Sequence, residues 1–133
     1  MKGRRGEKGF TLIELLIVVA ILGIIAAVVI PNVAGFLVTG TLNAANTEAE
    51  NVKTASLAFY AEYGTWDGVN DATKGYPAYL TGTLKATYTF GTSGTDAGLI
   101  DTAVAKAGTA GWPASIIWNK SSAAIGQRKW ERA

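Results

Sequence analysis

The sequence contains no cysteine and no histidine among its 133 residues. Disulfide bonds, thiolate zinc sites, cysteine or histidine nucleophiles and imidazole general bases are therefore excluded together. A small domain without disulfides needs another source of stability, and oligomerisation is one of the few available. The composition thus favours a component of an assembly.

Motifs of the common catalytic and nucleotide-binding sites are also missing: the sequence has no Walker loop, dinucleotide fingerprint, metal-ligand cluster or nucleophile elbow. Asp67, Asn70 and Asp71 offer oxygen ligands, but their spacing differs from that of an EF-hand loop, so a solvated turn is the better interpretation. Asp96 and Asp101 are interpreted in the same way. We therefore expect no enzyme activity, no metal and no cofactor.

Basic charge is scarce after the ninth residue. Of 12 basic and 10 acidic residues, residues 1–9 hold four basic and one acidic. They are Lys2, Arg4, Arg5 and Lys8, against Glu7. The remaining eight basic and nine acidic side chains sum to −1 and form no basic cluster. Nucleic acid is therefore not expected as the main partner.

What the sequence has in abundance is apolar residues near its start. The run from Leu12 to Ile30 is nineteen residues long and contains one charged side chain, Glu14. As a helix it would reach roughly 29 Å, enough to cross the ~30 Å hydrocarbon core of a bilayer. The run is longer than the apolar part of a secretory signal and lacks a small-residue cleavage site before a polar start. The basic residues before it predict that the N-terminus stays in the cytoplasm.

Glu14 is unexpected in this setting. A carboxylate costs about 2.5–3.5 kcal/mol at the centre of a bilayer and somewhat less near its edge. The neighbouring candidates within the segment are only Thr11 and apolar residues. An intramembrane acid without a partner in its own helix indicates a partner in another chain.

KGFTLIE, residues 8–14, resembles the processing motif of type IV prepilins and of the related type II secretion pseudopilins, and the resemblance extends to about residue 35. It implies that a membrane-embedded aspartyl peptidase, the prepilin peptidase, cuts between Gly9 and Phe10 and then methylates the new Phe10 amine. It also implies that Glu14 neutralises the Phe10 amine of a neighbouring subunit. Since the acid is relieved only when the chains are correctly staggered, the pair would set the axial register of a filament.

Pro31 is the first proline of the chain, and Gly23 precedes it. Proline removes one hydrogen bond of a helix and usually kinks it, so the simplest interpretation is that Pro31 ends the membrane helix. The resemblance implies something else. In such proteins a weak stretch of this kind unravels when subunits pack, which makes Gly23 to Pro31 the predicted extensible segment.

Beyond Pro31 the pattern predicts an amphipathic helix ending at a Gly64 C-cap. Apolar side chains recur at three- and four-residue steps, with Ser56 filling one gap: Leu42, Ala45, Ala49, Val52, Phe59 and Tyr63. The charged residues are assigned to the opposite face: Glu48, Glu50, Lys53 and Glu62. A helix continuous from Phe10 to Tyr63 would be roughly 80 Å long. Its first half would therefore pack on other subunits and its second half on its own head.

Residues 64–133 have the composition of a β-rich head, with frequent Thr, Gly, Tyr and Trp. Strands are expected at 84–90, 98–102, 115–119 and 126–130, the last two joined by a hairpin; a short helix over 99–107 is the alternative for the second. The aromatic residues are expected to form the core. They are Phe59, Tyr60, Tyr63, Trp66, Tyr76, Tyr79, Trp112, Trp118 and Trp130. Many pilins close a C-terminal loop with a disulfide, and because this chain lacks cysteine no residue roles are carried over to its head.

Together these features predict an α+β pilin fold, in which a long N-terminal α-helix packs on a small antiparallel β-sheet head. The expected domains are a cleaved leader (1–9), a transmembrane and filament-core helix (10–31), an amphipathic helix (32–63) and the head (64–133). The expected function is that of a structural subunit of a type IV pilus. The alternatives are the major pseudopilin of a type II secretion system and an extracellular binding domain on an uncleaved membrane anchor. The head shows no clear calcium loop of the kind expected of a pseudopilin, which favours the pilus.

The expected partners are other copies of the chain in a homopolymer filament, the prepilin peptidase, the inner-membrane pilus or secretion machinery, and the lipid bilayer before assembly. The precursor would reside in the inner (cytoplasmic) membrane and the assembled protein in an extracellular pilus on the cell surface.

Overall fold

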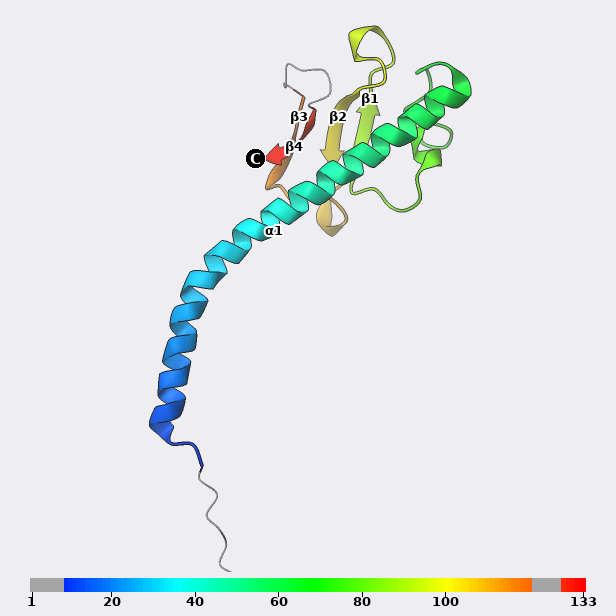
Figure 1. The fold of residues 1–133 in the computed structure, drawn as a ribbon. Coiled ribbons are helices and arrows are strands. Elements are labelled where there is room, and N and C mark those ends of the chain that lie inside the picture. Colours follow the sequence, from blue (N-terminus) through cyan, green and yellow to red (C-terminus); the bar gives the residue numbers. More distant parts are fainter. Residues whose placement is uncertain (1–8, 121–127) are drawn as a thin grey trace, which may run out of the picture. The chain divides into compact units, whose positions relative to one another are not determined.

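The computed structural model describes residues 9–120 and 128–133. A single α-helix, α1 (Leu12–Tyr63), comes first among them, and four short strands follow (Figure 1). The strands are β1 (Ala86–Phe90), β2 (Ile100–Ala105), β3 (Ile116–Asn119) and β4 (Lys129–Arg132). Three short 3₁₀ helices lie in the connections: η1 (Tyr76–Tyr79), η2 (Gly94–Asp96) and η3 (Gly108–Ala110). The predicted α+β class, a long N-terminal helix followed by small antiparallel sheets, is confirmed.

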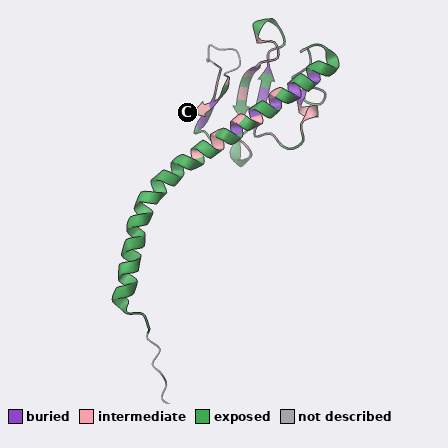
Figure 2. Cartoon of the chain, in the orientation of Figure 1, coloured by how far each residue is buried: buried purple, intermediate pink, exposed green. Residues whose placement is uncertain are grey.

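The chain divides into two units between Leu37 and Val38, inside α1. In the first unit every described residue is exposed, although most are apolar (Figure 2). By length and composition, α1 is the one helix of the described residues that is able to cross a membrane. An apolar helix without an internal partner needs lipid or other protein to cover it.

In the second unit, α1 buries one face against the head (Figure 2). The buried residues of the helix are Ala45, Ala49, Val52, Ala55, Ser56 and Phe59. They confirm the predicted stripe in its central part. The prediction is wrong for the last residue of the stripe, because Tyr63 is 52% exposed. Tyr63 lies over Phe59 from the solvent side, with 4.7 Å between the ring centroids. Gly64 follows with φ +68° and donates its N–H to the carbonyl of Tyr60, as expected of a C-cap.

The strands form two separate two-stranded antiparallel sheets, β1 with β2 and β3 with β4. Along β1 the side chains of Ala86, Tyr88 and Phe90 are buried while Thr87 and Thr89 are exposed, the alternation expected of a half-buried strand. In the first sheet Ala86 of β1 lies opposite Ala105 of β2. In the second sheet Ile116 of β3 lies opposite Arg132 of β4. Each sheet thus presents one face to the core.

The predicted strands are confirmed with shifted ends. The helix considered for residues 99–107 is wrong, because Ile100–Ala105 pair with β1, and strand pairing satisfies their backbone groups there. The strand expected at 126–130 is found at Lys129–Arg132. Residues 121–127, which include most of the predicted hairpin turn, lie outside the described residues.

Most of the predicted aromatic core is confirmed. Phe59, Tyr76, Trp112 and Trp130 are buried, together with Tyr88 and Phe90 of β1. Trp66, Tyr79 and Trp118 are partly buried against them. The exceptions are Tyr63 and Tyr60, because Tyr60 is 42% exposed and stacks on Trp66 at the end of the helix, 4.6 Å between centroids.

The prediction that Glu48 faces solvent is wrong. Its carboxylate accepts hydrogen bonds from the backbone N–H groups of Lys85 (2.9 Å) and Ala86 (3.2 Å). It also accepts from the Tyr88 hydroxyl (2.9 Å) and the Trp112 indole N–H (3.2 Å). Helical periodicity itself explains this partly buried position, since Glu48 lies three residues after Ala45 and four before Val52, both in the core. Burial, reinforced by this carboxylate, raises the pKa of Tyr88.

Because four donors of the head converge on one side chain of α1, we expect Glu48→Ala to destabilise the head strongly. Loss of the acceptor leaves partly buried donors without a partner, at a cost of about 2–4 kcal/mol. Chemical denaturation of the full-length protein in detergent, followed by tryptophan fluorescence, measures this loss.

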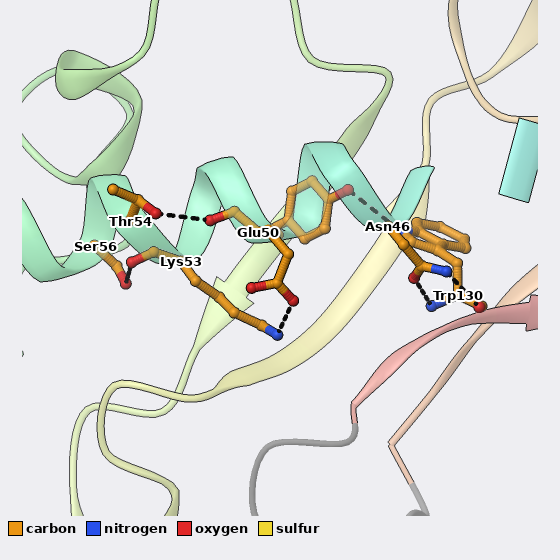
Figure 3. Close-up of polar contacts among 7 residues, drawn as sticks. Asn46, Glu50, Lys53, Thr54, Ser56 and Trp130 are labelled. Atoms are coloured by element: carbon orange, nitrogen blue, oxygen red, sulfur yellow. Dashed lines mark hydrogen bonds and ion pairs between the residues drawn. The ribbon is translucent and has the colours of Figure 1, made fainter. Parts of the chain in front are cut away.

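Glu50→Ala is the matched control. Glu50 lies two residues further along the same helix, is exposed and pairs with Lys53 at 2.7 Å (Figure 3). Exposed pairs of this kind contribute about 0.5 kcal/mol or less. Equal losses in the two variants would contradict the role assigned to Glu48.

Candidate assembly site

The first turn of α1 is closed by a reciprocal pair of hydrogen bonds between Thr11 and Glu14. The Thr11 hydroxyl accepts from the backbone N–H of Glu14 at 3.3 Å, and the Glu14 carboxylate accepts from the backbone N–H of Thr11 at 2.9 Å. Leu15 donates its N–H to the Thr11 carbonyl at 3.3 Å, which makes Thr11 the N-cap. The arrangement is a capping box.

The capping box gives Glu14 a role within its own chain. At the start of an α-helix the first backbone N–H groups have no helical partner, and a negative side chain there is favoured by the helix dipole. The sequence offers Thr11 as the one polar neighbour of Glu14, but the reciprocal bonding between the two residues was not predicted. The signal was present, because Thr11-x-x-Glu14 followed by an apolar run is the sequence pattern of a capping box.

The residues at the predicted cleavage point lie immediately before this cap. Phe10 is 87% exposed. A Cβ atom placed on Gly9 would meet no atom within 4 Å, so the surrounding structure does not require glycine there. Gly9, Phe10 and Glu14 thus lie together at one exposed end of α1. Cleavage, methylation and pairing between subunits involve other molecules and remain predictions.

Pro31 lies inside α1, so the interpretation that it ends the membrane helix is wrong. Proline has no N–H, and the helix therefore lacks the bond that residue 31 would donate to the Ala27 carbonyl. The side-chain amide of Asn32 donates to the neighbouring Val28 carbonyl at 3.2 Å. The segment is helical yet has one backbone bond fewer than its neighbours. The extension predicted for Gly23 to Pro31 concerns the filament and remains a prediction.

The glycines of the first unit are not required by packing within it. A Cβ on Gly23 or on Gly35 would meet no atom within 4 Å. Small residues on an exposed apolar helix allow a second helix to approach closely. The helix surface therefore suits packing against other helices.

Three of the acidic residues considered as calcium ligands, Asp71, Asp96 and Asp101, are engaged within the chain. The Asp71 carboxylate accepts from the Thr73 hydroxyl (2.7 Å) and from the backbone N–H groups of Thr73 (2.8 Å) and Lys74 (2.9 Å). These bonds, chiefly those from Thr73, lower the pKa of Asp71 to about 2. Asp96 pairs with Arg128 at 2.5 Å, and Asp101 pairs with Lys120. Within residues 9–120 and 128–133, no three His, Cys, Asp or Glu side chains are placed to hold a metal ion.

Known proteins are similar to this chain over its N-terminal segment and, in one case, over nearly its whole length. The family described as the prokaryotic N-terminal methylation motif matches residues 4–30. The fimbrial protein EcpC of Eikenella corrodens is 32% identical over 126 residues, which cover 94% of this chain and 81% of that protein. A fimbrial protein of Neisseria meningitidis serogroup B is 44% identical over 64 residues, 48% of this chain and 38% of the relative. No solved structure gives a significant match.

The similarity to several relatives is limited to part of their length. The type IV major pilin protein PilA of Myxococcus xanthus is 47% identical over 56 residues, which cover 42% of this chain and 26% of PilA. The chain spans little more than a third of the first Neisseria relatives, 38% and 34% of their lengths. The EcpC alignment, however, includes nearly the whole chain, head included, and most of the relative. Together with the methylation motif at the start of α1, it shows that the chain belongs to the type IV pilin family.

Proposed function

We propose that this protein is a structural subunit of a type IV pilus that polymerises through the first half of α1. The observation that carries the proposal is the first unit, in which an apolar helix exposes all its described side chains. Such a helix is stable in lipid and, after extraction, against helices of other subunits, so it never needs to meet water. A filament subunit has no enzyme activity, in agreement with the family.

Processing prepares this helix for assembly. The basic leader keeps the N-terminus on the cytoplasmic side until the prepilin peptidase of the inner membrane removes residues 1–9. Cleavage creates a cationic amine on Phe10, which is then methylated. The Glu14 carboxylate already lies at the same end of α1, held by the capping box. In the filament it would bind the Phe10 amine of the next subunit, which fixes the stagger between the chains.

A major pseudopilin would share all these N-terminal steps. A relative that matches nearly the whole chain, and those that match about half of it, are named as fimbrial proteins or type IV pilins, which supports the pilus. Assembly into long filaments on the cell surface, rather than a short periplasmic structure, is the outcome that distinguishes the two.

We expect the chain isolated from sheared surface filaments to begin at methylated Phe10, a result that intact-mass spectrometry checks directly. Gly9→Val should block cleavage, because the added branched side chain obstructs the approach of a protease to the backbone. The precursor should then accumulate in the membrane with α1 intact, since no atom lies within 4 Å of the added Cβ position. Wild-type filaments that retain Met1 would contradict the proposal.

Two variants distinguish the roles of Glu14 as a helix cap and as the proposed partner of the Phe10 amine. Glu14→Gln keeps an oxygen that accepts from the Thr11 N–H but removes the charge, so we expect membrane-inserted protein that forms few or no filaments. Thr11→Ala is the matched control, because it weakens the capping box by about 0.5–2 kcal/mol and leaves the charge. Its filament yield should stay near that of the wild type.

Immunoblots of sheared filaments measure the filament yield, and immunoblots of membranes measure the amount of inserted protein. If Glu14→Gln assembled normally while Thr11→Ala did not, Glu14 would act only as a helix cap.

We expect Pro31→Ala to yield filaments that extend less under load. Alanine restores the missing N–H and favours the helix by about 3 kcal/mol over proline, so the segment from Gly23 to Pro31 would resist unravelling. Stretching of single filaments in an optical trap measures the extension. Gly35→Ala, a helix-favouring change outside the segment and also in open space, is the control. Unchanged extension in Pro31→Ala would exclude this segment as the source.

A further inference from the structure

The outer edge of β1, the edge away from β2, is bonded to side chains instead of to another strand. Asn70 donates its amide N–H to the carbonyl of Phe90 at 2.8 Å and accepts from the N–H of Phe90 at 2.8 Å. The Tyr76 hydroxyl forms the same pair of hydrogen bonds with Tyr88: it donates to the carbonyl of Tyr88 at 3.0 Å and accepts from its N–H at 3.2 Å. In each case one side chain binds both backbone groups of one residue.

β4 carries the same feature in the second sheet. The side-chain amide of Asn46, on α1, donates to the carbonyl of Trp130 at 3.2 Å and accepts from its N–H at 2.8 Å (Figure 3). The strand is four residues long, and Trp130 lies in its interior opposite Trp118. One asparagine therefore occupies a large part of the available edge.

These contacts join distant parts of the sequence. Asn46 and Trp130 are 84 residues apart, Asn70 and Phe90 are 20 apart, and the two tyrosines are 12 apart. Alternate residues of a strand direct both backbone groups to the same side, so the residues that face away from β2 are the ones that these side chains reach. At the start of β1, the Glu48 carboxylate accepts from the N–H of Ala86 as well.

We propose that these side chains act as substitute strand partners and close the β1 edge of one sheet and the β4 edge of the other to a second copy of the chain. An open edge offers a row of N–H and C=O groups on which another strand can pair. An asparagine side chain carries the same donor and acceptor as a peptide group, so it satisfies both but cannot continue the ladder. Heads are thereby kept from pairing through these two edges. The inference does not rest on the proposed function, because it concerns the head of any copy of this chain.

The test uses full-length protein in detergent, with association measured by sedimentation velocity. We expect the wild type to keep its head monomeric and Asn70→Leu to shift toward dimers, because leucine leaves the Phe90 groups open. Hydrogen exchange of the 86–90 peptide should show protection that rises with protein concentration in the variant only. Asn46→Leu should do the same at β4, with protection rising in the 129–132 peptide.

Asn70→Asp gives a second test that does not depend on a bulky substitution. At pH 7 the aspartate accepts from the Phe90 N–H but repels its carbonyl, so this edge is half open. Below the ordinary aspartate pKa of about 3.9 the protonated acid donates to the carbonyl and closes the edge again. Dimers of Asn70→Asp should therefore decline, relative to wild type at the same pH, when the pH falls from 7 to 3.

Asn43→Asp, an exposed position on α1, controls for the added charge. The proposal is overturned if folded Asn70→Leu and Asn46→Leu, identified by native near-ultraviolet circular dichroism, remain as monomeric as wild type. It is also overturned if association of Asn70→Asp changes with pH no more than that of Asn43→Asp.

Discussion

The constraint on which the molecule depends is that the first half of α1 has no apolar partner among the described residues of its own unit. Its side chains are exposed along the whole segment from Leu12 to Leu37. Burial of apolar surface contributes about 25 cal/mol per Å², so a helix of this kind is strongly driven into lipid or against other helices. Both environments exclude water, and each leaves the polar groups of the helix to be satisfied internally. The capping box of Thr11 and Glu14, and the bond from Asn32 to Val28, are solutions to that requirement.

The second half of α1 is stabilised differently. It presents small and apolar side chains to the sheets and inserts one carboxylate, Glu48, among four donors of the head. A domain of this size without disulfides gains cohesion from such a junction, because helix and strand are joined by hydrogen bonds as well as by packing. Asn46 on the same helix binds β4. The helix is therefore tied to both sheets by polar side chains that also satisfy strand edges.

Sequence patterns predicted the parts governed by local rules. The long apolar run, the amphipathic stripe, the Gly64 cap and the alternation of β1 follow from periodicities of 3.6 and 2 residues. The edges and polar contacts of the head were not predictable in this way, because Asn46 meets Trp130, and Glu48 meets β1, across large separations in sequence. Two features had local signals that were overlooked: the capping-box spacing of Thr11 and Glu14, and the position of Glu48 between core residues on the helical wheel. The membership of the family was evident from residues 8–14, whereas the partners of Gly9, Phe10 and Glu14 are other molecules and lie beyond what one chain shows.

The central claim is that a carboxylate in an apolar setting is neutralised by the terminal amine of an adjacent subunit. An electron cryomicroscopy map of the assembled filament tests it most directly. The account predicts the Phe10 nitrogen of one subunit within hydrogen-bond reach, about 2.7–3.2 Å, of the Glu14 carboxylate of its neighbour. A map in which the amine is remote from every Glu14 of the adjoining subunits would contradict it.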